Sequence, residues 1–185
     1  MGEIDDAIER ADRESFTRQP PKTLKGQIGY LIRQLGSAKA VAQEIGVTAD
    51  SVNRYRRGAR KHARADVAAK IEDTVRARWQ PQVRKRRQRQ AATATGITVE
   101  TRARFGYTAP IGTTDDGRFR RLTVHLPPTY AQRLFDARNT GASDREMRQI
   151  IAEGFKEIYF QDGGSRATGL TDVAITDIDY LDLDY

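Results

Sequence analysis

The sequence predicts an α+β fold, with a helical N-terminal half that contains a helix-turn-helix and a C-terminal half built from a small antiparallel sheet with two helices. Two observations predict this fold. Apolar residues recur at helical spacing as far as Arg78, and they alternate at strand spacing from Ile97 onward. The net charge changes at the same place, from +10 over residues 1–90 to −3 over residues 91–185. We therefore expect two domains, 1–90 and 96–185.

The composition excludes several classes of protein. The 185 residues include no cysteine, which excludes disulfide scaffolds, cysteine-bound zinc and thiol catalysis, and only two histidines, which give little support for a histidine metal site. No apolar run approaches membrane-spanning length, and the N-terminus lacks the pattern of a signal peptide. We expect a soluble cytoplasmic protein without membrane contact, whose 32 basic against 25 acidic residues favour a polyanionic partner.

Three amphipathic segments of the N-terminal half predict helices on either side of its central motif. The first covers residues 4–11 and ends before Pro20. The second runs over about residues 23–35, where Gly36 ends it, and the third runs over residues 65–78.

The segment from Ala38 to Tyr55, A-K-A-V-A-Q-E-I-G-V-T-A-D-S-V-N-R-Y, matches the helix-turn-helix pattern. Ala42 is small where two helices cross, and Gly46 permits the positive φ of a tight turn. Thr48 caps the second helix, which in this geometry enters the major groove of DNA. The alternative is an ordinary helical hairpin with a solvated basic face. The residues expected to contact DNA, with Asn53 suited to adenine and Arg54 to guanine, are Thr48, Asp50, Asn53, Arg54, Arg56, Arg57, Arg60, Lys61 and Arg64.

A polybasic run, R-K-R-R-Q-R, follows the third helix. Such a run is typical of a solvated segment or of one that tracks DNA phosphates in a salt-sensitive way that is indifferent to sequence. We include Arg84, Lys85, Arg86, Arg87 and Arg89 among the candidate DNA contacts. The Q-A-A-T-A-T-G stretch after it is small, polar and glycine-containing, as linkers are, and marks the expected domain boundary.

Strict alternation predicts two strands, one over residues 97–107 and one over residues 119–126. The segment 109–117 between them contains Pro110, Gly112 and Gly117, which break regular structure. We expect an antiparallel hairpin with 109–117 as its loop.

Two further helices and a last strand follow. Pro127-Pro128 begins one helix, Gly141 ends it, and Ser143 caps the next. Strand, helix, glycine turn and helix is also the order of a ribbon-helix-helix DNA-binding module, which stays open as an alternative. The acidic segment from Asp172 alternates as a strand whose aspartates form a solvated edge, and alternate positions on a strand do not converge on one cation.

The sequence contains no Walker loop, no nucleophile elbow and no paired His-carboxylate spacing, so we do not expect an enzyme, an intrinsic cofactor or a bound metal. One segment stands out in the expected hairpin loop: Thr113 and Thr114 lie beside Asp115 and Asp116. These residue types suit a turn. They also suit a presented hydroxyl that acts as a nucleophile once the metal ions of another protein activate it.

The chain resembles the telomere terminal proteins of linear Streptomyces-type chromosomes and plasmids, essentially from end to end. The resemblance is carried by I-D-D-A-I-E-R-A, A-V-A-Q-E-I-G-V, R-W-Q-P, T-R-A-R-F-G-Y, G-T-T-D-D-G-R, R-L-T-V-H-L-P-P-T-Y-A-Q-R-L-F-D-A, A-E-G-F-K-E-I-Y-F-Q-D-G-G and the acidic C-terminus. It implies a protein primer that binds telomeric DNA in the nucleoid. A DNA polymerase, with its own divalent metal ions, joins the first deoxynucleotide to a hydroxyl of the primer, which stays covalently on the 5′ end.

The resemblance also implies which residues take part. The nucleotide is attached to Thr114, and a telomere-associated protein that binds the single-stranded 3′ overhang acts beside the primer. From the residue types themselves we expect Thr113, Asp115 and Asp116 to support the loop, with the two aspartates imitating primer phosphates or orienting the metal ions. A priming hydroxyl must enter a buried two-metal site, so it needs a narrow projection such as a hairpin.

Two other functions remain open from the sequence. One is a transcriptional or partition regulator that binds DNA non-covalently through a helix-turn-helix and a ribbon-helix-helix-like module. The other is an architectural nucleoid protein that binds duplex with little sequence preference and a steep dependence on salt. Neither would carry a covalently attached nucleotide.

Overall fold

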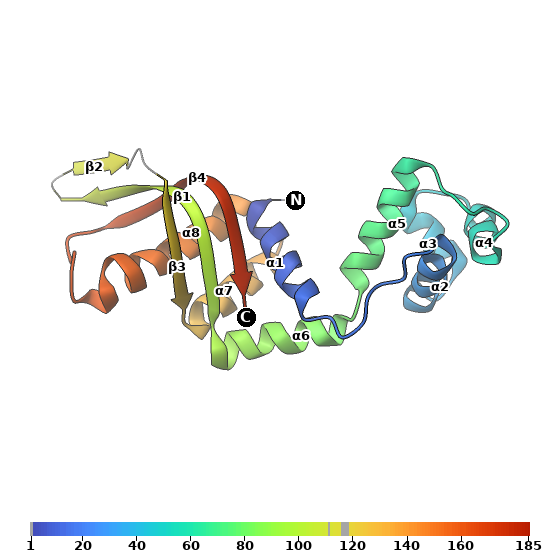
Figure 1. The fold of residues 1–185 in the computed structure, drawn as a ribbon, viewed down its shortest axis with the longest axis horizontal. Helices are drawn as coiled ribbons and strands as arrows, with labels where there is room; N and C mark the ends of the chain where they lie inside the picture. The colour runs from blue at the N-terminus through green and yellow to red at the C-terminus, as the bar shows by residue number, and fades with distance from the viewer. Residues whose placement is uncertain (1, 111, 116–118) are drawn as a thin grey trace. The chain divides into compact units, whose positions relative to one another are not determined.

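The computed structural model describes residues 2–110, 112–115 and 119–185, and the chain divides into two units (Figure 1). Unit 1 comprises residues 1–15 and 82–185, and unit 2 comprises residues 16–81. The regular structure of unit 2 is helical, whereas unit 1 combines helices with an antiparallel sheet. The α+β fold class expected from the sequence is therefore confirmed.

Unit 2 contains α2 (Leu24–Leu35), α3 (Ala38–Ile45), α4 (Ala49–Arg57) and α5 (Ala65–Arg78). The first three begin at a hydroxyl N-cap, Thr23, Ser37 and Thr48 respectively, and each hydroxyl accepts a hydrogen bond from the amide three residues later. The apolar stripes of the four helices share one core, which contains Ile28, Tyr30, Leu31, Val41, Ala42, Ile45, Val52, Tyr55, Val67, Ile71 and Val75.

The sheet of unit 1 is built around β1 (Ile97–Ala109). One edge of β1 pairs with β3 (Arg120–Leu126) and, further along, with β2 (Gly112–Asp115). The other edge pairs with β4 (Asp172–Asp184), and all of these pairs are antiparallel. The expected pairing of the two alternating segments is thus observed between β1 and β3.

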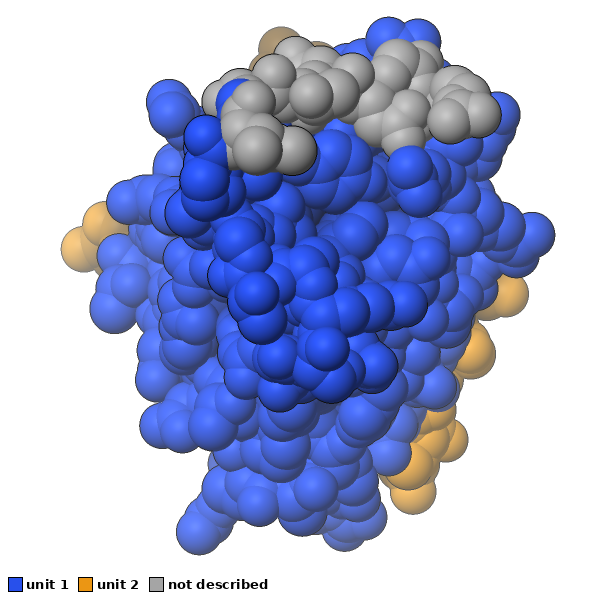
Figure 2. Space-filling model, turned by 90° about the vertical axis from the view of Figure 1, so that its left-hand side faces the viewer, with its two compact units in different colours: residues 1–15, 82–185 blue, residues 16–81 orange. Residues whose placement is uncertain are grey.

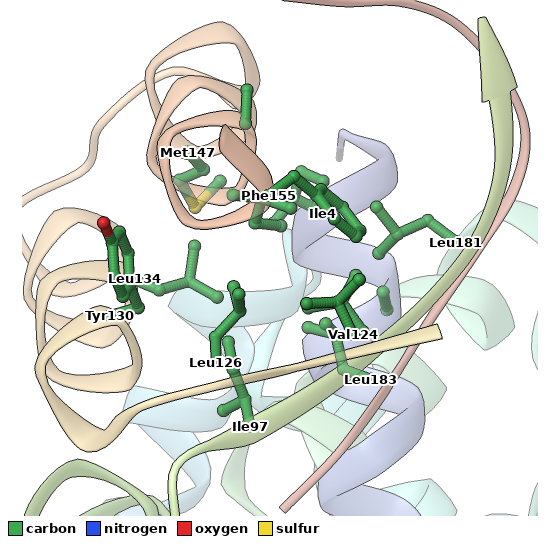
Figure 3. Packing of buried hydrophobic residues seen from close by; sticks show 14 of the residues in the cluster. Ile4, Ile97, Val124, Leu126, Tyr130, Leu134, Met147, Phe155, Leu181 and Leu183 are labelled. Atoms are coloured by element: carbon green, nitrogen blue, oxygen red, sulfur yellow. The ribbon is translucent and has the colours of Figure 1, made fainter. Parts of the chain in front are cut away.

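The helices of unit 1 are α1 (Glu3–Glu14), α6 (Pro81–Gln90, of which Pro81 belongs to unit 2), α7 (Pro128–Asn139) and α8 (Asp144–Gly154). A π-helical turn over Phe155–Phe160 continues α8. Figure 3 shows side chains of α1, α7 and α8 meeting side chains of the sheet, among them Ile4, Leu134, Met147, Val124 and Leu181. The strand residues that take part alternate along β1, so Val99, Ala103 and Phe105 are buried while Arg102 is exposed.

β4 contains two register shifts opposite Arg102–Phe105. The apolar residues that face the core follow the same irregularity, because Ile175, Ile178 and Leu181 are three residues apart instead of two. Each shift inserts one extra residue into β4 and restores its apolar side to the helices. The aspartates at Asp177 and Asp179 are thereby brought to the outer face of the sheet, where they pair with Arg104 and Arg102.

The units do not correspond to the expected domains 1–90 and 96–185. α1 packs into the core of unit 1 through Ile4, Ala7 and Ile8, and α6 also belongs to that unit. The expected linker is a π-helical turn over Ala91–Thr95 that continues α6, with Ala91 fully buried. Three of its five residues are alanine, the best helix former, and Ala91 is small enough to pack in the core.

We expect Gly96→Ala to lower the free energy of unfolding by about 3 kcal/mol or more. Gly96 has a φ of 73° and a ψ of −164°, and a Cβ there would lie 2.2 Å from the carbonyl oxygen of Leu126. Gly141→Ala is the control, because Gly141 has a φ of 78° with nothing within 4 Å of its Cβ position, and should lose only about 1–2 kcal/mol. Urea denaturation measures both, and equal losses would show that the contact with Leu126 has no effect.

Across the residues that the structure describes, no helix is both long and apolar enough to cross a membrane.

Candidate nucleic-acid interface

The helix-turn-helix of unit 2 is formed by α3 and α4. Gly46 joins them in the left-handed region with a φ of 71°, and Thr48 caps α4 by accepting a hydrogen bond from Ser51 N at 3.2 Å. Val52 and Tyr55 turn into the core, so the opposite side of α4 faces solvent. That side contains Asp50, Asn53, Arg54 and Arg57, which are spaced as one helical face.

The charge on this face is partly compensated. Asp50 forms an ion pair with Arg54 at 2.8 Å, one turn apart on α4, and both side chains remain more than half exposed. An exposed pair of this kind holds the arginine in place without neutralising it strongly. Arg56, Arg57, Arg60 and Lys61 are exposed and form no ion pair with the described residues. Unit 2 as a whole has 14 basic and five acidic residues, a net charge of +9, whereas unit 1 has a net charge of −2.

A hollow of about 620 Å³ lies beside the N-terminus of α4. Thr48 and Ser51 line it together with Arg60, Lys61 and Arg64. Arg64 also approaches Asp66 at 3.4 Å, with both side chains well exposed. The structure therefore brings all nine sequence-predicted residues of unit 2 to α4 and to the segment that follows it, and it adds Ser51 and His62 to that group.

The polybasic run belongs to unit 1 and is helical, as part of α6. Because the run is helical, its side chains differ in their exposure to solvent. Lys85, Arg86 and Arg89 are exposed, Arg87 is half-buried, and Arg84 is only 8% exposed. Arg84 is thus a correction to the expected DNA contacts, because its guanidinium is engaged inside the protein.

Arg84 lies in a buried ion cluster between α1 and α6. Its guanidinium donates to Glu9 at 2.7 and 3.0 Å and to Asp12 at 3.0 Å. Asp12 is fully buried and also accepts hydrogen bonds from Gln88 and from the hydroxyl of Tyr185. The cluster extends to α7, where Arg138 donates to Glu9 and Asp5, so it ties the N-terminal helix to two others and to the C-terminus.

Acid should weaken this cluster. Burial raises the pKa of Glu9, but hydrogen bonds from Arg84 and Arg138 outweigh burial, so the pKa lies below its ordinary value of 4.5. A carboxylate of this kind contributes stability above pH 4.5 and loses that contribution as the pH falls through its folded-state pKa. Below pH 4.5 the free energy of unfolding should therefore decline less steeply in Glu9→Gln than in the natural chain. Equal slopes in urea denaturation would contradict this.

A sequence signal for the cluster exists but is weak. Arg84, Gln88 and Ala91 are spaced four and three residues apart, as one face of a helix that begins at Pro81, and Glu9 and Asp12 are three residues apart on α1. Arg84 is one of several basic residues in a row, so the sequence does not distinguish it from its exposed neighbours.

The threonine segment lies on the β1–β2 hairpin, at the end of unit 1 that faces the viewer in Figure 2. Ala109 at the end of β1 pairs with Gly112 at the start of β2. Tyr107 is the Cα partner of Thr114, and Thr108 that of Thr113. The expected loop 109–117 is therefore partly wrong, because Gly112–Asp115 forms a strand. The side chains of Thr113, Thr114 and Asp115, and the whole of Asp116, lie outside the described residues.

The β1 strand of this hairpin is firmly packed where it pairs with Thr113 and Thr114. The ring of Tyr107 meets the ring of Phe160 edge-on with centroids 5.0 Å apart, and Phe160 in turn meets Phe105 at 5.7 Å. On the far edge of β1, the amide of Thr171 donates to the carbonyl of Thr108 at 2.8 Å. Phe160 belongs to the π-helical turn after α8. This turn therefore holds β1 in place where β1 pairs with β2.

Within the described ranges, no group of three or more His, Asp or Glu side chains is arranged to hold a metal ion. Comparisons with protein-family models, with curated proteins and with solved structures found no match.

Proposed function

We propose that this chain is a DNA-end-binding protein that serves as a primer for DNA synthesis. More specifically, it is a terminal protein of a linear chromosome or plasmid, which acts in the nucleoid with a DNA polymerase and a protein that binds the single-stranded overhang. Unit 2 holds telomeric duplex, and the hydroxyl of Thr114 receives the first deoxynucleotide.

The proposed reaction takes place in the polymerase. The hydroxyl oxygen of Thr114 attacks the α-phosphorus of a deoxynucleoside triphosphate, a phosphoester bond forms, and the bond to the β-phosphate breaks. Pyrophosphate leaves, and the hydroxyl proton passes to a base or water in the polymerase site. The metal ions of the polymerase activate the hydroxyl and stabilise the leaving group. This chain supplies the nucleophile and its position, and no catalytic group of its own.

The observation that carries the proposal is the place of Thr114 on a four-residue strand that pairs with β1 and with no other described strand. At this end of the sheet β1 lies between β2 and β4, because Tyr107 is the Cα partner of both Thr114 and Val173. Thr114 therefore lies on an outer strand, and we propose that a polymerase receives the hydroxyl from that strand, as it receives the 3′ end of a DNA primer. The packing of Tyr107 and Thr108, the Cα partners of Thr114 and Thr113, supports the role, because a nucleophile must be held still to react efficiently.

The DNA-binding half of the proposal is supported by the exposed face of α4 and by the charge of unit 2. A helix of this kind presents Asn53 and Arg54 to base edges and Arg57 to phosphates. The ribbon-helix-helix alternative receives less support, because β3 pairs with β1 of the same chain. In a ribbon-helix-helix dimer the equivalent strand would pair with a second copy.

The variant Arg57→Gln/Arg60→Gln should bind duplex less tightly and with a weaker dependence on salt. Each lost phosphate contact lowers the slope of log K against log salt by about 1. Arg145→Gln, which removes an exposed arginine of α8 in unit 1, is the matched control and should leave the slope unchanged. Fluorescence anisotropy at several salt concentrations measures both. An unchanged slope in the double variant would contradict the assignment of these residues to DNA.

A further inference from the structure

An exposed aromatic ring stands on the outer face of the sheet. Phe119 directly precedes β3 and is 39% exposed, and Tyr159 is the other large apolar side chain that is exposed among the described residues. The guanidinium carbons of Arg102 and Arg104 lie 5.1 and 4.8 Å from the centroid of the Phe119 ring. Ion pairs with Asp179 and Asp177 hold these two arginines in place.

This face is the one that the helices of unit 1 leave uncovered. Along β1, Thr101, Ala103 and Phe105 are buried toward α1, α7 and α8, so Arg102 and Arg104 between them face the other way. The side chains of Arg102, Arg104 and Arg121 on this face are 43–71% exposed.

Charge is divided across the same face. Three arginines lie on β1 and β3, at Arg102, Arg104 and Arg121, with Glu100 of β1 beside Arg121, whereas β4 contributes Asp177 and Asp179. The exposed aromatic ring thus lies on the basic side of the sheet, with the acidic strand beyond it. Arg121 pairs with Glu100 and remains mostly exposed, so it is accessible to an anion.

We propose that the Phe119 surface, defined as Phe119, Arg102, Arg104 and Arg121, binds single-stranded DNA. One unpaired base stacks on the open side of the Phe119 ring, and neighbouring phosphates contact the arginines. A base inside a duplex has no free face for such stacking, so the surface selects the single strand. The choice of DNA rests on the proposed function, in which an unpaired end is the template that the primed polymerase copies.

The position of the surface fits that role. Arg104 is two residues from Gly106, the Cα partner of Asp115 at the end of β2. A strand held at Phe119 would therefore lie beside the hairpin that carries the acceptor hydroxyl. Template and nucleophile would enter the polymerase from the same part of unit 1.

Titration of the full chain with fluorescent (dT)12 and with a blunt duplex tests this proposal. Phe119→Leu should bind (dT)12 at least about fivefold more weakly, because a stacked base loses its aromatic partner, and should bind the duplex as before. Tyr159→Leu removes the other exposed aromatic ring and should bind both as the natural chain does. The proposal is overturned if Phe119→Leu binds (dT)12 with normal affinity, loses affinity for (dT)12 and the duplex equally, or behaves like Tyr159→Leu.

Photocrosslinking of the natural chain to an oligonucleotide that contains 5-iodouracil gives a second measurement, which does not depend on a variant. The adduct should lie on the peptide that contains Phe119, and crosslinks confined to residues 16–81 would overturn the proposal. Thr114→Ala separates this inference from the priming function. Loss of attachment in that variant with normal (dT)12 binding leaves both intact, whereas attachment that persists contradicts priming alone.

Discussion

Thr114→Ala should abolish the attachment of nucleotide to this protein. The substitution removes the hydroxyl that we propose as the nucleophile, and no rearrangement of the backbone supplies another oxygen at that position. Incubation with the cognate polymerase and a labelled deoxynucleotide, followed by a denaturing gel, measures the attachment. Duplex affinity should be nearly unchanged, because the proposed duplex contacts of α4 belong to unit 2 and Thr114 belongs to unit 1. Thr114→Ser, which keeps a hydroxyl, should retain activity.

Thr113→Ala is the matched control for this experiment. Thr113 and Thr114 are adjacent in β2 and pair with adjacent residues of β1, Thr108 and Tyr107. Either alanine lowers strand propensity by a similar amount, within about 1 kcal/mol, so a difference between the variants reports chemistry and not folding. Normal labelling of Thr114→Ala, or equal loss in both variants, would contradict the assignment of Thr114.

Arg84→Met should lower the free energy of unfolding by about 3–5 kcal/mol. The substitution leaves Glu9 and Asp12 buried with less than their full set of donors, and Asp12 is fully buried. Methionine occupies much of the same volume, so the loss reports the broken ion cluster more than a cavity. Chemical denaturation measures the change, and duplex affinity should stay the same under conditions where the variant is folded.

Arg86→Met separates the two roles that the polybasic run contains. Arg86 lies two residues after Arg84 on α6 and is exposed. The free energy of unfolding of the variant should therefore change by no more than about 0.5 kcal/mol. In DNA binding, we expect Arg86→Met to lower the slope of log K against log salt by about 1, through the loss of one phosphate contact of α6. A stable Arg84→Met variant with weakened DNA binding would show that Arg84 is a DNA contact after all.

The helices of unit 2 could be predicted closely from the sequence because each carries its own signals. Thr23 and Thr48 mark starts, Gly36 and Gly46 mark ends, and the apolar spacing between them fits one helical period. The unit to which α1 belongs could not be predicted in this way. The apolar stripe of α1 indicates that the helix packs against another element, but it does not indicate which one. Only the tertiary structure shows that Ile4 and Ile8 pack against the sheet.

The candidate sites differ in the same way, because some depend on local spacing and others on contacts between residues far apart in the sequence. The outward face of α4 follows from local periodicity, so the positions of Asn53 and Arg54 were predictable. The burial of Arg84 depends on Glu9 and Asp12, more than 70 residues away, and composition alone favours exposure. Phe119 is exposed beside Arg102 and Arg104 because β1 and β3 pair in one particular register, which the sequence pattern does not specify.

The most direct test of the priming function is the mass of this protein released from cellular DNA by exhaustive nuclease digestion. Trypsin would then release residues 105–118 as one peptide. We expect this peptide to carry the mass of a deoxynucleotide, and fragmentation to place it on Thr114. Protein recovered from DNA without a nucleotide, or with the nucleotide on any other residue, would contradict the priming function.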